Sequence, residues 1–285
     1  MIGAEVELAG LRLSLRADGP EDECAAFARA LGPYTVESGA PDAPSLEIEL
    51  TLDPHAPLEL KDHVDIIRSR DGYQIRSDLI TGRVSDTTAR LRASGGGVRS
   101  LLMAVRLVLG LWLAPRRGLL LHGASIEVDD GALLFLGAEG MGETTLARRL
   151  AEEGLHVIAD EVAAVRLGAP QAREQAAVAA HLFGHPLPRR LGDGLAPRAG
   201  LPLLAIAILS QAGSASAGEV VQLPLARAAR SLLARLFQPA TAREINQAVL
   251  ESIDQIARRV PVFMLALPND RRAVSLALSL RPRAA

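Results

Sequence analysis

The sequence predicts an α/β protein in which strands and helices alternate around one glycine-rich loop. Apolar residues 119–128 and 132–136 flank the turn-forming Asp129-Asp130-Gly131, which indicates a β-hairpin. The glycine-rich segment 137–145 follows at once and leads into a helical pattern. The alternation then continues to the C-terminal end, and 285 residues suffice for one large domain or two modest ones.

The glycine-rich segment has the spacing G-x-x-x-x-G-[K]-[ST] of a phosphate-binding loop, except that Glu143 stands at the lysine position. Glycines let successive backbone N–H groups point inward, and the positive end of the following helix adds to this anion site. The pattern therefore predicts a nucleotide-binding loop. Its expected nucleotide-binding residues are Gly137, Gly140, Gly142, Glu143, Thr144 and Thr145.

The charge of this loop is opposite to what a polyphosphate requires. A lysine at position 143 would reach the β- and γ-phosphates, whereas Glu143 and the nearby Glu139 add carboxylates. Each carboxylate opposes a polyphosphate by roughly 1 kcal/mol or more if it is partly desolvated. Thr144 is in place to hold Mg²⁺, or it is only a hydroxyl that caps helix N–H groups.

The sequence predicts two domains. Residues 1–95 are expected to form a small N-terminal α+β lobe, and residues 96–285 are expected to form the domain that contains the loop. Alternating patterns indicate strands at residues 4–8, 11–15, 46–52, 64–68, 73–77 and 81–85. A helix is expected at 21–31 between Pro20 and Gly32. Residues 94–97 read as a flexible joint between the two lobes.

The second domain is expected to contain further helices and strands. Helices are predicted at residues 98–113, 145–153, 226–236, 241–259 and 271–280. Strands are predicted at residues 155–159, 203–209, 220–223 and 261–267, the first ending at Asp160 and Glu161. Arg227, Arg230 and Arg235 read as an exposed basic face of their helix, Thr241 opens a capping box, and Asn269 caps the last helix.

His122-Gly123, the hairpin, the loop and V-I-A-D160-E161 together resemble the core of bacterial HPr kinase/phosphorylase and its shorter relatives. The resemblance covers about residues 118–166 and implies a P-loop HPr-kinase-like (PEP-carboxykinase-like) core that uses ATP and Mg²⁺. It implies that Asp160 accepts the proton of an attacking serine hydroxyl, with His122 beside it. Glu161 takes the place of a second aspartate, and Thr144 with Glu161 would hold Mg²⁺.

Other residues near the loop allow more than one interpretation. Residues 181–192 have the punctuated composition of a functional loop, and Arg189 and Arg190 are candidates to replace the missing lysine. They also fit ordinary surface arginines. His122 likewise fits a core histidine in an apolar strand.

Three functions are consistent with these residues. The first is an ATP-dependent serine kinase-like phosphotransferase that acts on a peptide, a protein or a small-molecule hydroxyl. The shorter relatives that the chain resembles include small kinases encoded in modified-peptide gene clusters, some of which phosphorylate a serine of a peptide. The alternative is a catalytically impaired pseudokinase that binds a peptide or protein partner, because Glu143 replaces the lysine. The third is a phosphorylase or nucleotide hydrolase that uses the same site.

Composition bears on what the protein binds and where in the cell it is located. The net charge of −2 argues against general binding to nucleic acid or an anionic membrane. One cysteine, Cys24, fits a reducing compartment, and the apolar run 101–114 is too short to span a membrane. We therefore expect a cytoplasmic protein, and the sequence leaves oligomerisation open.

Overall fold

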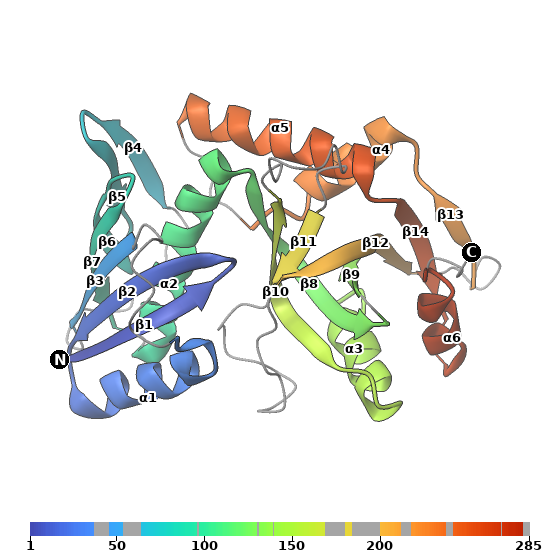
Figure 1. The fold of residues 1–285 in the computed structure, drawn as a ribbon, viewed down its shortest axis with the longest axis horizontal. Coiled ribbons are helices and arrows are strands. Elements are labelled where there is room, and N and C mark those ends of the chain that lie inside the picture. The colour runs from blue at the N-terminus through green and yellow to red at the C-terminus, as the bar shows by residue number, and fades with distance from the viewer. Residues whose placement is uncertain are drawn as a thin grey trace, which may run out of the picture. The chain divides into compact units, whose positions relative to one another are not determined.

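The chain has an α/β fold with two mixed β-sheets in a computed structural model (Figure 1). The structure describes residues 1–36, 46–53, 64–95, 97–129, 131–138, 140–168, 180–183, 200–211, 218–237, 242–268 and 270–281. Two compact units are present, the first built mainly on Met1–Pro115 and the second mainly on residues from Arg116 onward. Residues 98–115 thus cluster with the first unit, and the predicted domain boundary after residue 95 stays a prediction.

The first unit is a seven-stranded sheet covered by helices. Its strands are β1 (Ile2–Leu8), β2 (Leu11–Asp18), β3 (Leu46–Asp53), β4 (Asp65–Ser69), β5 (Gly72–Arg76), β6 (Ile80–Val84) and β7 (Thr88–Ser94), in the order β1-β2-β3-β7-β6-β5-β4. Helices α1 (Glu21–Leu31) and α2 (Val98–Leu113) contact each other and strands of this sheet. Alternate residues of β3 are buried, as its period-two pattern predicts.

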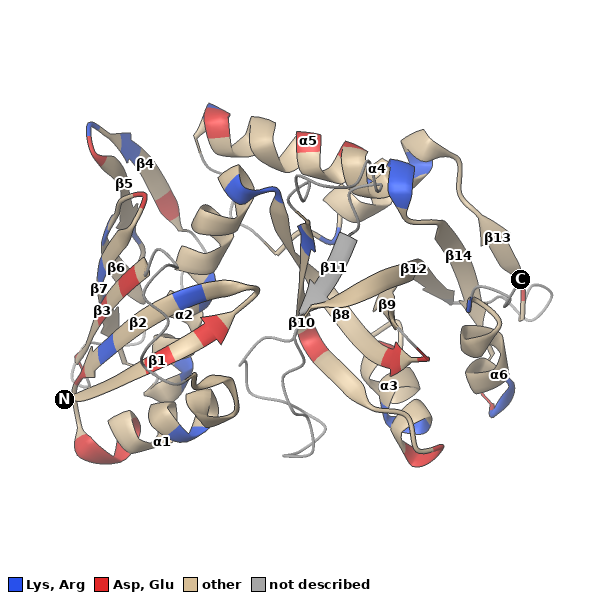
Figure 2. Ribbon diagram, in the orientation of Figure 1, with Lys and Arg blue, Asp and Glu red and all other residues tan. Residues whose placement is uncertain are grey.

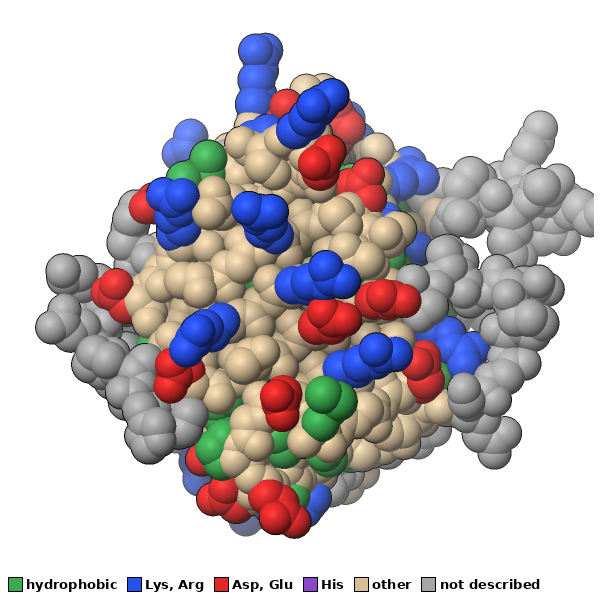
Figure 3. Space-filling view, turned by 90° about the vertical axis from the view of Figure 1, so that its left-hand side faces the viewer, with side chains coloured by type: hydrophobic (Ala, Val, Ile, Leu, Met, Phe, Trp, Pro, Cys, Tyr) green, Lys and Arg blue, Asp and Glu red, His purple; other side chains and the backbone are tan. Residues whose placement is uncertain are grey.

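The opposite face of this sheet carries charged side chains of both signs. Figure 3 shows basic and acidic residues mixed over the face that it draws. Arg90 and Arg92 of β7 pair across strands with Glu49 and Asp53 of β3, at 2.7 and 2.5 Å. Cross-strand pairs of this kind support the register of two parallel strands, although each exposed pair contributes only about 0–1 kcal/mol.

The second unit is also built on a seven-stranded sheet. Its strands are β8 (Gly118–Val128), β9 (Gly131–Leu136), β10 (Val157–Leu167), β11 (Ala180–Phe183), β12 (Leu201–Gln211), β13 (Val220–Gln222) and β14 (Val262–Leu267), in the order β11-β10-β8-β9-β12-β14-β13. The predicted hairpin is confirmed, since Val128 of β8 pairs with Gly131 of β9. Strands β9, β12 and β14 run parallel, so their carboxyl ends lie at one edge, where the glycine-rich loop leaves β9.

Within the described residues, the second unit contains α3 (Glu143–Glu152), α4 (Leu225–Leu233), α6 (Arg272–Leu278) and the part of α5 (Arg243–Arg259) from Ala248 onward. Helices α3 and α6 contact each other, and together they pack on one side of the sheet (Figure 1). Their shared core contains Phe135, Leu146, Leu150 and Leu265, each no more than 2 % exposed. This core fixes the start of α3, and with it the end of the glycine-rich loop.

Several elements differ from the sequence prediction. Strand β7 was not predicted, because its short T-A-R-L-R-A-S pattern is dominated by polar residues. The prediction that the strand after α3 ends at Asp160 and Glu161 is wrong, because β10 continues to Leu167. The apolar residues after Glu161 pair with the first half of β8, which extends the ladder.

Helix α2 is longer than the apolar run predicted from sequence. With the turn that follows it, the helical segment Val98–Arg116 has 19 residues and is long and apolar enough to cross a membrane. The prediction that the run is too short therefore does not hold for this segment. Most of its apolar part is buried, as in a core helix of a folded α/β protein.

Candidate functional site

The glycine-rich loop connects β9 to α3, as its sequence predicts. Gly140 and Gly142 have φ angles of 80° and 97°, and Gly142 is the residue before the first turn of α3. Leu146 donates its N–H to the carbonyl of Gly142 at 2.8 Å, which starts the helix. Thus a strand, a tight glycine loop and a helix N-terminus follow one another in the arrangement that binds phosphate in other proteins.

Glu143 folds back into this loop. A Cβ placed on Gly137 would lie 2.6 Å from Oε1 of Glu143 and 2.7 Å from its Cδ. The Glu143 side chain is 9 % exposed, and among the described residues its Oε1 has no hydrogen-bond partner. The carboxylate lies in the first turn of α3, where the helix dipole favours a negative charge. The anion site of the loop is therefore filled, at least in part, by the protein's own carboxylate.

A cavity of about 470 Å³ opens beside the loop within the second unit. Its lining residues are His122, Gly123, Gly137, Ala138, Gly140, Glu143, Thr144, Asp160, Glu161, Ala234, Arg235, Leu236 and Phe237. All three predicted catalytic residues thus line one cavity together with the start of α3. Thr145 does not line it and instead lines a second cavity on the other side of the loop.

The pairing of β8 with β10 places the catalytic candidates side by side. Asp160 of β10 lies opposite Ala124, and Glu161 lies opposite Gly123. Asp160 is 6 % exposed, whereas Glu161 is half-buried. At Gly123 a Cβ would collide with the carbonyl oxygen of Phe135, so only glycine fits where β9 approaches β8.

His122 is half-buried in β8, one residue before Gly123. Its backbone N–H donates to the carbonyl of Arg235 at 2.9 Å, and its ring centroid lies 6.0 Å from that of Phe237. Among the described residues, the buried Nδ1 of His122 has no hydrogen-bond partner. The ring therefore combines packing on an aromatic side chain with an unused polar atom at the cavity.

Arg235 is a cavity residue that sequence reasoning missed. Helix α4 ends at Leu233, so Arg235 lies beyond the helix and is half-buried, and its assignment to an exposed basic face is wrong. Arg227 and Arg230 do lie on α4 and are exposed. Figure 2 shows where basic and acidic positions fall along the helices and strands. The residues after Leu233 are ordinary helix formers, so nothing in the sequence marks the end of α4 there. The predicted helix therefore continued to residue 236 and included Arg235.

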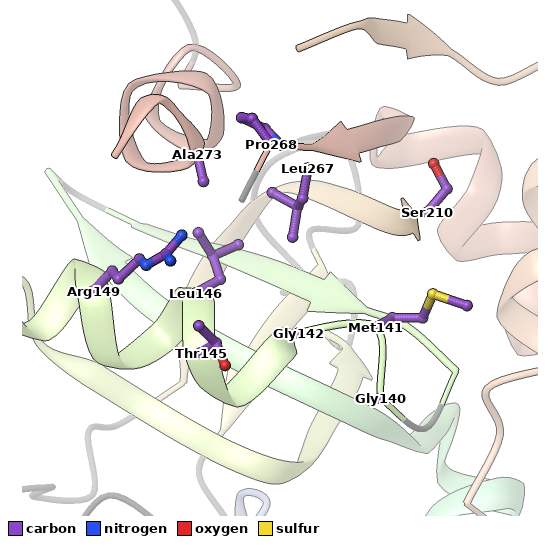
Figure 4. Close-up of a pocket in the computed structure, with 10 residues that line it drawn as sticks. All are labelled: Gly140, Met141, Gly142, Thr145, Leu146, Arg149, Ser210, Leu267, Pro268 and Ala273. Atoms are coloured by element: carbon purple, nitrogen blue, oxygen red, sulfur yellow. The ribbon is translucent and has the colours of Figure 1, made fainter. Parts of the chain in front are cut away.

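The second cavity, of about 380 Å³, lies between the loop, α3, the ends of β12 and β14, and α6 (Figure 4). In Figure 4, Leu146, Leu267, Pro268 and Ala273 form its apolar walls, and Met141 extends from the loop. Arg149 is the charged side chain among the described residues that line it. The two cavities share Gly140, so the loop lies between the acidic cavity and this second cavity.

Charged residues at the start of α6 interact with α3 at the edge of the second cavity. Arg149 of α3 donates from Nη1 to the backbone carbonyl of Asp270 at 3.1 Å. Arg272 donates from Nε to Oδ2 of Asp270 at 2.9 Å, and this hydrogen bond lowers the pKa of Asp270 below its usual value. Arg149 is thus directed to the α6 side, and no ion pair joins it to Glu143 among the described residues.

Some predicted residues lie outside the part of the chain that the structure describes. These are Glu139, Arg189, Arg190, Thr241 and Asn269. The proposed roles of Arg189 and Arg190 as substitutes for the lysine stay predictions. Arg148, which could have paired with Glu143, is exposed on α3.

The oxygen donors needed for Mg²⁺ come together in the first cavity. Thr144, Asp160 and Glu161 line it, and Mg²⁺ is commonly held by one or two protein oxygens together with the phosphates of a bound nucleotide. Within the described residues no cluster of three or more His, Cys, Asp and Glu side chains is arranged to hold a metal alone. The residues present therefore fit a nucleotide-associated Mg²⁺ by the type of their donor atoms.

Comparison with known proteins gives a family. No curated protein is significantly similar to this chain. Among solved structures, the Hpr(Ser) kinase/phosphatase from Coxiella burnetii is similar at 11 % identity and a TM-score of 0.30, over 56 % of this chain and 87 % of that one. A similarity of this size supports no conclusion about activity. The profile of the family described as "SynChlorMet cassette protein ScmC" matches residues 98–272, which is more than half of the chain. The chain therefore belongs to the SynChlorMet cassette protein ScmC family.

Proposed function

We propose that this protein is an ATP-dependent phosphotransferase, related to HPr kinase, that phosphorylates a hydroxyl group of a peptide, a protein or a small molecule in the cytoplasm. The observation that carries the proposal is the convergence of His122, Thr144, Asp160 and Glu161 on one cavity beside the glycine-rich loop. These residues come from β8, α3 and β10, so the fold and not their sequence spacing brings them together. A carboxylate base beside a glycine-rich loop and a set of oxygen donors for Mg²⁺ are recurring parts of phosphoryl-transfer sites.

The chain's own residues divide the work as follows. The buried carboxylate of Asp160 accepts the proton as the acceptor oxygen forms its bond to the γ-phosphorus. The bond between that phosphorus and the bridging oxygen breaks, and the nucleoside diphosphate leaves. His122 lines the cavity together with Asp160. Thr144 and Glu161 would hold Mg²⁺, which neutralises phosphate charge when it is bound. The second cavity shares Gly140 with the first and has Leu146, Leu267 and Pro268 in its wall, so the nucleoside portion would lie there beside the phosphates.

A second candidate function is supported by Glu143. Its carboxylate lies against Gly137, inside the loop where a phosphate group would bind. A phosphate can enter only if this side chain moves out, because two anions in a partly desolvated loop repel each other. A chain in which Glu143 stays in place would be a pseudokinase that keeps the fold and binds a peptide or protein partner.

The two candidates differ in nucleotide binding, which calorimetry with Mg-ATP and Mg-ADP measures directly. We would titrate the natural chain, Glu143→Lys and Glu143→Gln, the last removing the charge without adding a cation. Glu152→Gln, an exposed position at the other end of α3, serves as the control for removing one negative charge. The phosphotransferase proposal predicts binding by the natural chain and tighter binding by Glu143→Lys.

Binding only by Glu143→Lys would reject phosphotransfer by the natural chain and favour the pseudokinase. Absence of binding by every variant, each checked for an unchanged circular dichroism spectrum, would reject a nucleotide site at this loop. For a chain that binds, Asp160→Asn separates binding from chemistry. It should abolish hydrolysis and transfer while Mg-ATP affinity changes by less than about tenfold.

A further inference from the structure

We propose that Arg235 supplies the positive charge that the glycine-rich loop lacks, and that its guanidinium binds the phosphoryl group of the nucleotide. This inference rests on the proposed function. It adds a phosphate-binding residue from the end of α4, far from the loop in sequence. Its position, its electrostatic surroundings and the contacts that hold it in place each support this role.

Arg235 lines the same cavity as Glu143, Thr144 and Asp160. Among the described residues that line this cavity, it is the one arginine or lysine, against the three carboxylates of Glu143, Asp160 and Glu161. A polyphosphate that enters therefore meets a net negative wall in which Arg235 is the permanent positive charge. Arginine suits this role because its planar guanidinium donates two parallel hydrogen bonds to phosphate oxygens.

The guanidinium of Arg235 is incompletely hydrogen-bonded in the described structure. Its Nε is buried and has no hydrogen-bond partner among the described residues, while its Nη1 donates to the carbonyl of Ala234 at 3.3 Å. A buried donor without a partner is unfavourable. A bound anion would satisfy this donor, so the position of Arg235 suits a ligand with acceptor oxygens.

The backbone around Arg235 is fixed to the central strand of the site. The carbonyl of Arg235 accepts from the N–H of His122, and the N–H of Phe237 donates to the carbonyl of Leu120 at 2.8 Å. Leu236 forms an antiparallel bridge with Leu121. These contacts use the part of β8 that lies beyond its pairing with β9, which begins at Ala124. Arg235 and His122 are therefore positioned by one strand, and their relative placement does not depend on the loop.

The test compares two substitutions of Arg235 with one of a matched arginine. Arg235→Gln removes the charge and keeps hydrogen-bonding atoms, Arg235→Lys keeps the charge, and Arg230→Gln changes an exposed arginine of α4. Each is made in the natural chain and in Glu143→Lys, and Mg-ATP affinity is measured by calorimetry. Thermal unfolding identifies any variant that does not fold, and Arg235→Lys then serves as the second variant.

If the inference is correct, Arg235→Gln weakens Mg-ATP binding by about tenfold to a hundredfold, the range of a charge-assisted hydrogen bond to phosphate. Arg235→Lys recovers part of that loss, and Arg230→Gln changes affinity by less than about twofold. The loss should be smaller in Glu143→Lys, where a second cation is present.

Two results would overturn the inference. If Mg-ATP binds and Arg235→Gln leaves its affinity unchanged, Arg235 only balances the carboxylates, and the proposed function stands without it. Equal losses for Arg235→Gln and Arg235→Lys would show that the side chain acts through packing and not through its charge. If no variant in either background binds Mg-ATP, the proposed function itself fails, and the inference fails with it.

Discussion

Removing the charge of Glu143 should stabilise the protein. The Oε1 atom of Glu143 is buried without a hydrogen-bond partner among the described residues, and Asp160 and Glu161 line the same cavity. Leaving a buried polar group unsatisfied costs about 1–3 kcal/mol, and the cost is larger when the group is charged. Against this, a carboxylate in the first turn of a helix contributes about 0.3–1 kcal/mol.

Glu143→Gln keeps the size and the buried polar atoms of the side chain and removes only the charge, so we expect it to raise the free energy of unfolding by about 1 kcal/mol. For a folded unit of this size, the midpoint of thermal unfolding should rise by about 2–4 °C. Differential scanning calorimetry on the ligand-free protein measures this shift. Nucleotide must be absent from the sample, because a bound ligand would add its own stabilisation.

Glu244→Gln provides a matched control. Glu244 is an exposed acidic residue in the first turn of α5, so it has the helix-end interaction without the burial. This variant should be slightly less stable than the natural chain. Opposite signs for Glu143→Gln and Glu244→Gln would support the reasoning, whereas a decrease for both would refute the claim that burial of the Glu143 carboxylate is unfavourable.

Three further outcomes are expected. Gly123→Ala should lower the free energy of unfolding by about 1–3 kcal/mol in urea denaturation, because the added Cβ would collide with the Phe135 carbonyl. As a control, Gly32→Ala should change the free energy of unfolding by less than about 1 kcal/mol, because there is open space around Gly32. Phe135→Ala should cost about 3–5 kcal/mol in the same assay, because the ring is fully buried in the core of the second unit. The hydrogen bond from Arg272 lowers the pKa of Asp270 in the folded protein. Its contribution to stability is therefore complete above the ordinary aspartate pKa of about 3.9, and it is lost as the pH falls through the lower pKa of the folded protein. The difference in unfolding midpoint between the natural chain and Asp270→Asn should thus persist at neutral pH and disappear in strong acid.

The features predicted correctly from sequence are those fixed by local chemistry. Turn residues between two apolar runs predicted the β8–β9 hairpin, and the glycine spacing predicted the loop between β9 and α3. Their conformations depend on residues close in the chain, so a local pattern contains the necessary information. The grouping of His122 with Asp160 was also predicted, through a resemblance and not through the pattern alone.

The features that were missed depend on contacts between distant residues. The extension of β10 past Glu161 is stabilised by pairing with β8, and neither strand alone indicates it. Arg235 reaches the site because residues 235–237 bond to residues 120–122, more than a hundred positions earlier. The orientation of Glu143 is likewise a packing result, since the sequence shows a carboxylate in the loop without showing that it turns toward Gly137.

The contact between Gly137 and Glu143 has a consequence for the evolution of this loop. A Cβ at position 137 would lie 2.6 Å from Oε1 of Glu143, whose carboxyl group can turn away, and 2.8 Å from the Cβ of Met141, which cannot, whether or not a nucleotide ever binds. Selection against replacement of this glycine would thus continue in a lineage that had lost phosphate binding altogether. In relatives that carry glutamate at the position of Glu143, retention of Gly137 is therefore evidence of steric necessity, and the residue at position 143 is the better marker of a working nucleotide site.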